Sequence, residues 1–167
     1  MNTRAKKTAY YALCIALAFV FSYLESLIPL NIGVPGIKLG LANLVVVAAL
    51  YVMGDRDAFI ISMIRILLCG LTFGGVFSLV YSFAGGILSF AVMLLAKKSK
   101  RLSVLGVSVL GAAVHNVGQI AAAAAVMENA GVFYYLPVLL LSGAVTGALI
   151  GVLSGTVISR IEKLRID

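Results

Sequence analysis

Apolar runs long enough to cross a lipid bilayer, separated only by short polar links, fill this chain of 167 residues almost from end to end. The runs lie near residues 8–28, 38–53, 58–73, 76–96, 103–126 and 136–159, so we expect six transmembrane helices. A water-soluble fold is excluded, because 62% of the residues are hydrophobic and only 11% are charged. The sequence therefore predicts an all-α membrane protein with a single transmembrane domain over residues 1–167.

The second and third expected helices are short for this purpose, at or slightly below the usual minimum of about 17 residues. Glycines cluster around the end of the third helix, at Gly70, Gly74 and Gly75. Irregular backbone is not tolerated against lipid, because its polar groups find no water there. We therefore expect the glycine-rich link to dip into the protein.

Positive charges predict the orientation in the membrane. Eleven of the 13 Lys and Arg residues lie on one side of the six expected helices, at the chain ends or in alternate links. They are Arg4, Lys6, Lys7, Arg56, Lys97, Lys98, Lys100, Arg101, Arg160, Lys163 and Arg165. Cytoplasmic links carry such an excess, so both termini are expected in the cytoplasm. Because topology accounts for the charge, we predict no nucleic-acid partner.

Polar side chains within the expected helices are candidates for a binding site. His115, Asn116 and Gln119 share one face near the middle of the fifth helix, since residues three and four apart are neighbours on a helix. Exposure of these side chains to lipid would be costly, so they should point inward. They could bind a ligand, or they could join helices by hydrogen bonds.

Two basic residues do not follow the orientation rule. Arg65 lies within the third helix, where it could bind an anion or extend toward the cytoplasmic interface. Lys38 begins the second helix on the outer side, and it could belong to a site or simply be a solvated loop charge.

Small residues recur on three of the helices and predict close helix packing, because they let backbones approach one another. The sixth helix carries glycines at every fourth position, and the fourth helix carries a stripe of small and hydroxyl residues. The first set is Gly143, Gly147, Gly151 and Gly155, and the second is Ser78, Tyr81, Ser82, Gly85, Gly86 and Ser89. The stripe on the fourth helix could also line a cavity, with Tyr81 its most distinctive member. On the first helix, Ala12 and Ala16 form a weaker pair of this kind.

Several catalytic motifs are absent from the sequence. There is no GxxxxGK[ST] phosphate loop, no aspartate-rich pair for magnesium and a diphosphate, and no Cys/His set with metal-site spacing. We therefore expect neither enzymatic activity nor a bound metal or cofactor. Any ATP would be used by a partner subunit.

Four segments carry a resemblance to a known family. They are PGIKLGLAN at 35–43, RILLCGLTFG at 65–74, FSLVYSFAGGILS at 77–89 and HNVGQ at 115–119. The chain resembles, over about residues 9–160, the bacterial family labelled Gx transporter or heptaprenyl diphosphate synthase component I. Its six spans are similar to the substrate-binding S components of energy-coupling factor transporters.

This resemblance implies a location in the bacterial cytoplasmic membrane and a bundle like that of the S components. It implies that Ala12 and Ala16 dock onto a coupling subunit driven by two ATPases. It also implies that the outer loops and helices 4 to 6 hold the substrate. The candidates carried over by position are Lys38, Asn43, Tyr81, His115, Asn116 and Gln119. Arg65 is added to them as the residue within the third helix that could bind an anion.

The function we expect is uptake of a small molecule, such as a vitamin or a quinone or isoprenoid precursor, as the substrate-binding subunit of such a transporter. The alternative is a non-catalytic membrane subunit that supports a prenyl diphosphate synthase or an enzyme of a quinone pathway. A passive channel is a third possibility, which the sparse charge along the helices disfavours.

Overall fold

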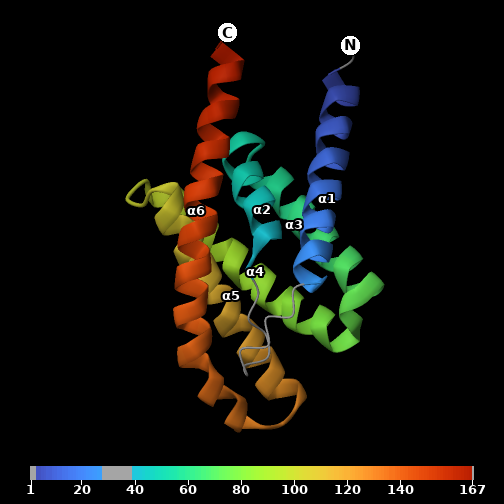
Figure 1. The fold of residues 1–167 in the computed structure, drawn as a ribbon, viewed down its shortest axis with the longest axis vertical. Helices are drawn as coiled ribbons and strands as arrows, with labels where there is room; N and C mark the ends of the chain where they lie inside the picture. The colour runs from blue at the N-terminus through green and yellow to red at the C-terminus, as the bar shows by residue number, and fades with distance from the viewer. Residues whose placement is uncertain (1–2, 28–38, 167) are drawn as a thin grey trace.

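The computed structural model describes residues 3–27 and 39–166, and over this part of the chain it is helical throughout, with no strand. Six α-helices alternate in direction, and the two ends of the chain lie at the same end of the bundle (Figure 1). They are α1 (Thr3–Leu27), α2 (Leu41–Val52), α3 (Asp55–Cys69), α4 (Gly75–Ser99), α5 (Val104–Val126) and α6 (Leu136–Ile166). Two short turns precede α4 and α6, a π-helical turn η1 (Gly70–Gly74) and a 3₁₀ turn η2 (Ala130–Tyr135).

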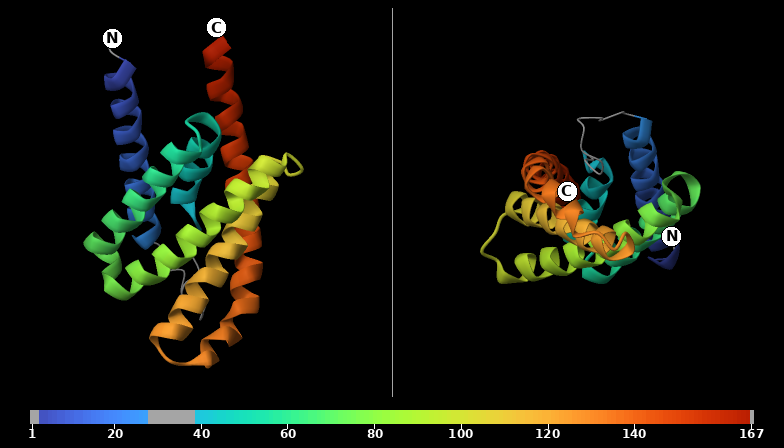
Figure 2. Two further views of the ribbon diagram at one scale, coloured as in Figure 1. Left: turned by 180° about the vertical axis from the view of Figure 1, so that it is seen from behind. Right: turned by 90° about the horizontal axis from the view of Figure 1, so that it is seen from below.

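Glycines set the two sharp reversals around α3. Gly54 has φ 109° and separates α2 from α3, and Gly75 has φ 74° and ψ 166° where α4 begins. Only glycine adopts such backbone angles without strain, because it lacks a Cβ. As a result α3 and α4 run antiparallel, although no polar segment separates them (Figure 2).

Helix α2 lies inside the bundle and carries more of the buried apolar residues than any other helix. Seven of its 12 residues are buried, and it contacts α1, α3 and α6. Val46, Val47 and Leu50 pack there against Ile61 of α3 and Phe90 of α4. At 1.5 Å per residue α2 is only about 18 Å long. Its burial among longer helices explains how so short an apolar helix is accommodated.

Helix α5 packs closely against both of its neighbours. A Cβ added at Gly118 would come within 2.8 Å of the Gly85 Cα of α4. On the other side, a Cβ at Gly147 or Gly151 of α6 would come within 2.9 and 2.7 Å, respectively, of α5 backbone atoms. A Cβ on Gly155 would touch nothing within 4 Å. Of the four glycines predicted to pack on α6, three therefore lie against α5, namely Gly143, Gly147 and Gly151.

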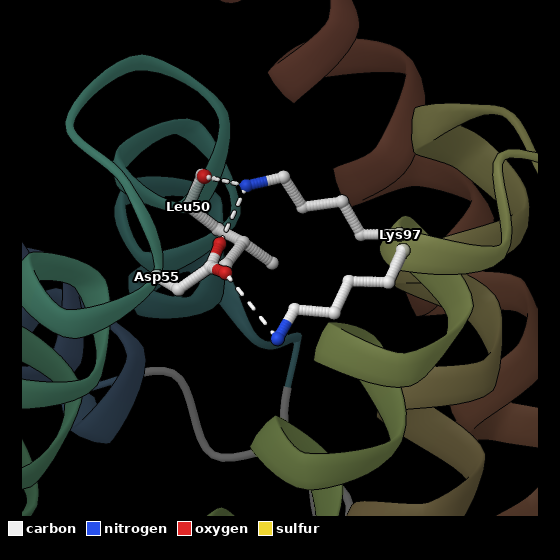
Figure 3. Close-up of polar contacts among 4 residues, drawn as sticks. Leu50, Asp55 and Lys97 are labelled. Atoms are coloured by element: carbon white, nitrogen blue, oxygen red, sulfur yellow. Dashed lines mark hydrogen bonds and ion pairs between the residues drawn. The ribbon is translucent and has the colours of Figure 1, made fainter.

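The end of the bundle that holds both chain ends is tied together by ion pairs. Lys97 Nζ of α4 lies 2.7 Å from an Asp55 carboxylate oxygen and donates to the Leu50 carbonyl oxygen at 2.7 Å (Figure 3). Asp57 pairs with Lys7 of α1 at 2.9 Å and accepts a hydrogen bond from the Tyr11 hydroxyl at 2.6 Å. These contacts join α1 and α4 to the start of α3.

The helix bounds differ from those predicted. Four stretches are long and apolar enough to cross a membrane, namely 5–27, 55–99, 104–126 and 130–164, and α2 forms a shorter apolar helix. The second stretch folds back at Gly75, so it contains both α3 and α4. Helices α1 and α6 extend beyond the predicted spans, and α2 and α3 are shorter than the chain needs to cross 30 Å of hydrocarbon as straight helices.

The prediction that the glycine-rich link dips into the protein holds only in part. No residue of η1 is buried, and Leu71 is 71% exposed. A π-helical turn satisfies its backbone hydrogen bonds internally, so the segment can lie at the surface. Three residues of the turn, Gly70, Phe73 and Gly74, nevertheless border an interior cavity.

Candidate functional site

A cavity of about 330 Å³ lies among the helices, in the half of the bundle away from the chain ends. All six helices contribute to its wall, chiefly through the last turns of α1 and α3, the start of α2 and α4, and the middle of α5. Its volume is at the lower end of the range for small-molecule sites. The apolar core of the bundle lies mainly in the other half, and it meets the cavity at Val47 and Met93.

Arg65 supplies the positive charge of the cavity. It is the eleventh residue of α3, about 15 Å along the helix from its start. Its Nη2 donates a long hydrogen bond of 3.4 Å to Asn43 Oδ1 of α2. Its Nε is buried and has no hydrogen-bond partner among the described residues. The side chain is therefore directed into the bundle, and not along α3 toward the end that carries the basic residues.

His115, Asn116 and Gln119 of α5 all line the cavity. The Asn116 amide donates to the Leu139 carbonyl of α6 at 2.5 Å, so this side chain both joins two helices and borders the cavity. The backbone carbonyl of His115 lies against Gly85 of α4, where any larger residue would push the histidine away. The close α4–α5 crossing thus positions this polar group.

Glu25 is a cavity residue that the sequence did not indicate. It lies in the last turn of α1 and accepts a hydrogen bond from the Gly40 backbone N–H at 2.5 Å. A carboxylate beside a helix N-terminus is favourable because unpaired N–H groups gather there. Glu25 therefore joins α1 to the start of α2 at the cavity wall.

Hydroxyl side chains complete the wall, and they fall into two groups. The first group donates to backbone carbonyls of α1, α5 or α6, and its members are Ser26, Ser89, Ser108, Ser142 and Thr146. Ser22, Ser78 and Ser82 line the same cavity, and no hydrogen bond from them is found among the described residues. The second group is available to a ligand or to water.

One predicted site residue does not line the cavity, and another is not described by the structure. Tyr81 is half-buried on α4 but is not part of the wall, although its neighbours Ser78 and Ser82 are. Lys38 lies outside the described residues. The structure thus gathers Asn43, Arg65, His115, Asn116 and Gln119, the last three as the sequence placed them on one face.

Ala12 and Ala16 are exposed on α1 and face away from the cavity. With Ile15 and Phe19 they border a shallow apolar groove whose other wall is Leu68 and Thr72. The groove lies at the surface between α1 and the end of α3.

Among the described residues, no group of three His, Cys, Asp or Glu side chains could hold a metal ion. The cavity instead offers one cation, one carboxylate, an imidazole and many neutral polar groups. Such a wall suits non-covalent recognition of a small polar molecule.

A bundle of long apolar helices with exposed leucines and phenylalanines outside and a polar cavity inside defines a membrane protein with a candidate small-molecule site. Comparison with protein families specifies it further. The chain belongs to the family described as heptaprenyl diphosphate synthase component I, whose model matches residues 14–157. Comparison with curated proteins and with solved structures gave no match.

Proposed function

We propose that this protein is the substrate-binding subunit of an ATP-driven transporter of the energy-coupling factor type, which takes up a small polar molecule. The observation that carries the proposal is the polar cavity within the membrane helices, at the end opposite the basic residues. Polar groups at membrane depth are costly, so a hollow polar region there is accounted for by a ligand.

The charges favour an outward-facing cavity. Apart from Arg65, the described basic residues lie at the end of the bundle that holds both chain ends (Figure 1). Lys7 and Lys97, for example, pair there with Asp57 and Asp55 at the start of α3, beside Arg56. By the positive-inside rule this is the cytoplasmic end. The cavity then lies nearer the outer face of a bacterial cytoplasmic membrane, where a substrate for uptake arrives.

Energy for uptake would come from partners, because the sequence has no phosphate loop. The exposed small residues Ala12 and Ala16 offer a face of α1 that another helix can approach closely. A coupling subunit bound there would connect the protein to its ATPases.

The test is to purify the protein in mild detergent and identify bound small molecules and proteins by native mass spectrometry. We expect a defined small molecule that is lost from His115→Ala and Asn116→Ala, and co-purification of membrane and ATPase subunits that is lost when Ala12 and Ala16 are both changed to Leu. An empty cavity in the wild-type protein, with no ATPase partner, would refute the proposal.

The family description supports a second candidate, a non-catalytic membrane subunit that recruits a prenyl diphosphate synthase. In that case a soluble synthase should co-purify through the basic end of the bundle, and charge reversal at Arg56 and Arg101 should release it. ATPase subunits would be absent.

The proposed topology has six crossings with both termini in the cytoplasm. Single cysteines placed at Arg101 and Glu128, in a variant with Cys14 and Cys69 changed to Ser, test it. A membrane-impermeant maleimide added to intact spheroplasts should label position 128 and not position 101. Labelling of both positions would contradict this topology.

A further inference from the structure

The guanidinium of Arg65 lacks the partners that a buried cation requires. It carries five N–H donors, and the one hydrogen bond found among the described residues is the 3.4 Å contact with Asn43. No carboxylate of the described residues lies within 4.0 Å of it, and its buried Nε has no acceptor. Burial of an unpaired charge is strongly unfavourable unless an anion accompanies it.

Glu25 does not fill this role, although it lines the same cavity. Its carboxylate accepts from the Gly40 N–H at the start of α2 and makes no ion pair with Arg65. The negative charge of Glu25 is held at a helix N-terminus, where the backbone dipole favours it, and it attracts Arg65 only from a distance. Among the described residues, no anion is in direct contact with the Arg65 guanidinium.

Charge distinguishes between the anions that could bind here. Arg65 is the one Lys or Arg among the described residues that line the cavity, and Glu25 already supplies a negative charge. A phosphate or diphosphate group, with about two or more negative charges, would leave excess charge in a region of low dielectric. A carboxylate brings a single charge and fits the planar fork of a guanidinium.

The rest of the wall indicates what the remainder of the ligand carries. Ser22, Ser78, Ser82 and Gln119 face the cavity with no hydrogen bond found among the described residues. Hydroxyl and amide groups of this kind bind hydroxyls, amides or ring nitrogens. We propose that the cavity binds a small monocarboxylate with further hydrogen-bonding groups, anchored by its carboxylate on Arg65. This inference rests on the proposed binding function and specifies its substrate class.

The test compares Arg65→Gln with Arg56→Gln, which removes an exposed arginine at the other end of the bundle. Small molecules released from each purified protein are identified by mass spectrometry. We expect a carboxylate from the wild type and from Arg56→Gln, and at least a roughly 100-fold smaller affinity in Arg65→Gln, because the anion loses its charged partner. A bound molecule without a carboxylate, or a carboxylate retained by Arg65→Gln, would overturn the inference.

If the protein purifies empty, probes replace the native ligand. Lactate, mandelate and nicotinate are each added beside their primary amides, and inorganic phosphate is added separately, while the thermal midpoint is measured. The inference is supported if at least one acid raises the thermal midpoint more than its amide does, and if this difference is lost in Arg65→Gln but kept in Arg56→Gln. Equal effects of every acid and its amide, or stabilisation by phosphate in preference to the acids, refute it.

The outcome for this inference is separable from that for transport. The binding assays use the isolated subunit and need no ATPase. Carboxylate binding without ATPase partners would refute the proposed transporter function and leave the inference about the substrate class intact. A neutral ligand lost from His115→Ala, with ATPase partners present, would do the reverse.

Discussion

Gly118→Ala adds only one methyl group, but it should destabilise the bundle more than so small a change suggests. The added Cβ would lie 2.8 Å from the Gly85 Cα and 3.1 Å from both the Ala84 carbonyl oxygen and the Gly85 nitrogen. All three are backbone atoms of α4, so no side chain can rotate to make room. Overpacking costs about 1–3 kcal/mol, and we take the upper end because the backbones must separate.

Alanine also favours the helix over glycine by about 1 kcal/mol, which offsets part of the clash. The net loss is about 2 kcal/mol, or a thermal midpoint about 4–8 °C lower for a chain of this length. Gly155→Ala on α6 is the matched control, because its Cβ would meet nothing within 4 Å. It should gain about 0.5–1 kcal/mol.

A fluorogenic maleimide can follow unfolding in detergent, because Cys14 and Cys69 are free thiols and only partly exposed. The chain has no tryptophan to report instead. A Gly118→Ala protein that melts no lower than the wild type would show that α4 and α5 do not cross closely at Gly85. The control separates this result from a general effect of replacing glycine.

Four further substitutions test one turn and the charged end of the bundle by the same melting assay. Lys97→Met should cost about 1–2 kcal/mol of unfolding free energy, allowing for the partial exposure of Lys97, because it removes two charge-assisted hydrogen bonds of 2.7 Å. Lys98→Met is its control, because the Lys98 ion pair is longer, at 4.0 Å, and its loss should cost no more than about 0.5 kcal/mol. Asp57→Asn should cost about 1 kcal/mol, because it weakens both contacts to α1, and an unchanged midpoint would show that α1 is held by packing alone. Gly75→Ala should cost about 1–3 kcal/mol through backbone strain, since nothing lies within 4 Å of its Cβ, and a neutral effect would contradict the reversal at this residue.

The helical fold and the inward polar face of α5 could be predicted because each follows from local spacing in the sequence. Apolar runs predict helices whatever their neighbours are, and residues 115, 116 and 119 share a face on any helix. The conformation of the glycine-rich link could not be obtained in this way. Whether Gly70–Gly74 turns inward or continues as a π-helical turn depends on backbone angles that many sequences allow.

The missed and misplaced site residues show a different limit. Glu25 ends an apolar run, where an acidic residue is typical of the membrane interface, and its partner Gly40 is 15 residues away. Tyr81 belongs to the predicted stripe on α4, but the cavity meets that helix at Ser78, Ser82 and Ser89, and Tyr81 lies to one side of this face. Periodicity shows which residues share a helix face. It does not show how each helix is rotated about its axis in the bundle, because tertiary packing sets that rotation.

The division of the bundle into two halves explains how a polar cavity can exist in so small a membrane protein. Val47, Leu50 and Ile61 pack in the half near the chain ends, where Asp55 and Asp57 also hold α1 and α4 to α3. The other half is joined mainly by glycine contacts, which bring backbones together without filling the space between their polar faces. Most of the core, including Leu50 and Ile61, lies outside the cavity wall, although Val47 and Met93 belong to both. Much of the wall can therefore change to suit another ligand while the packed half preserves the fold.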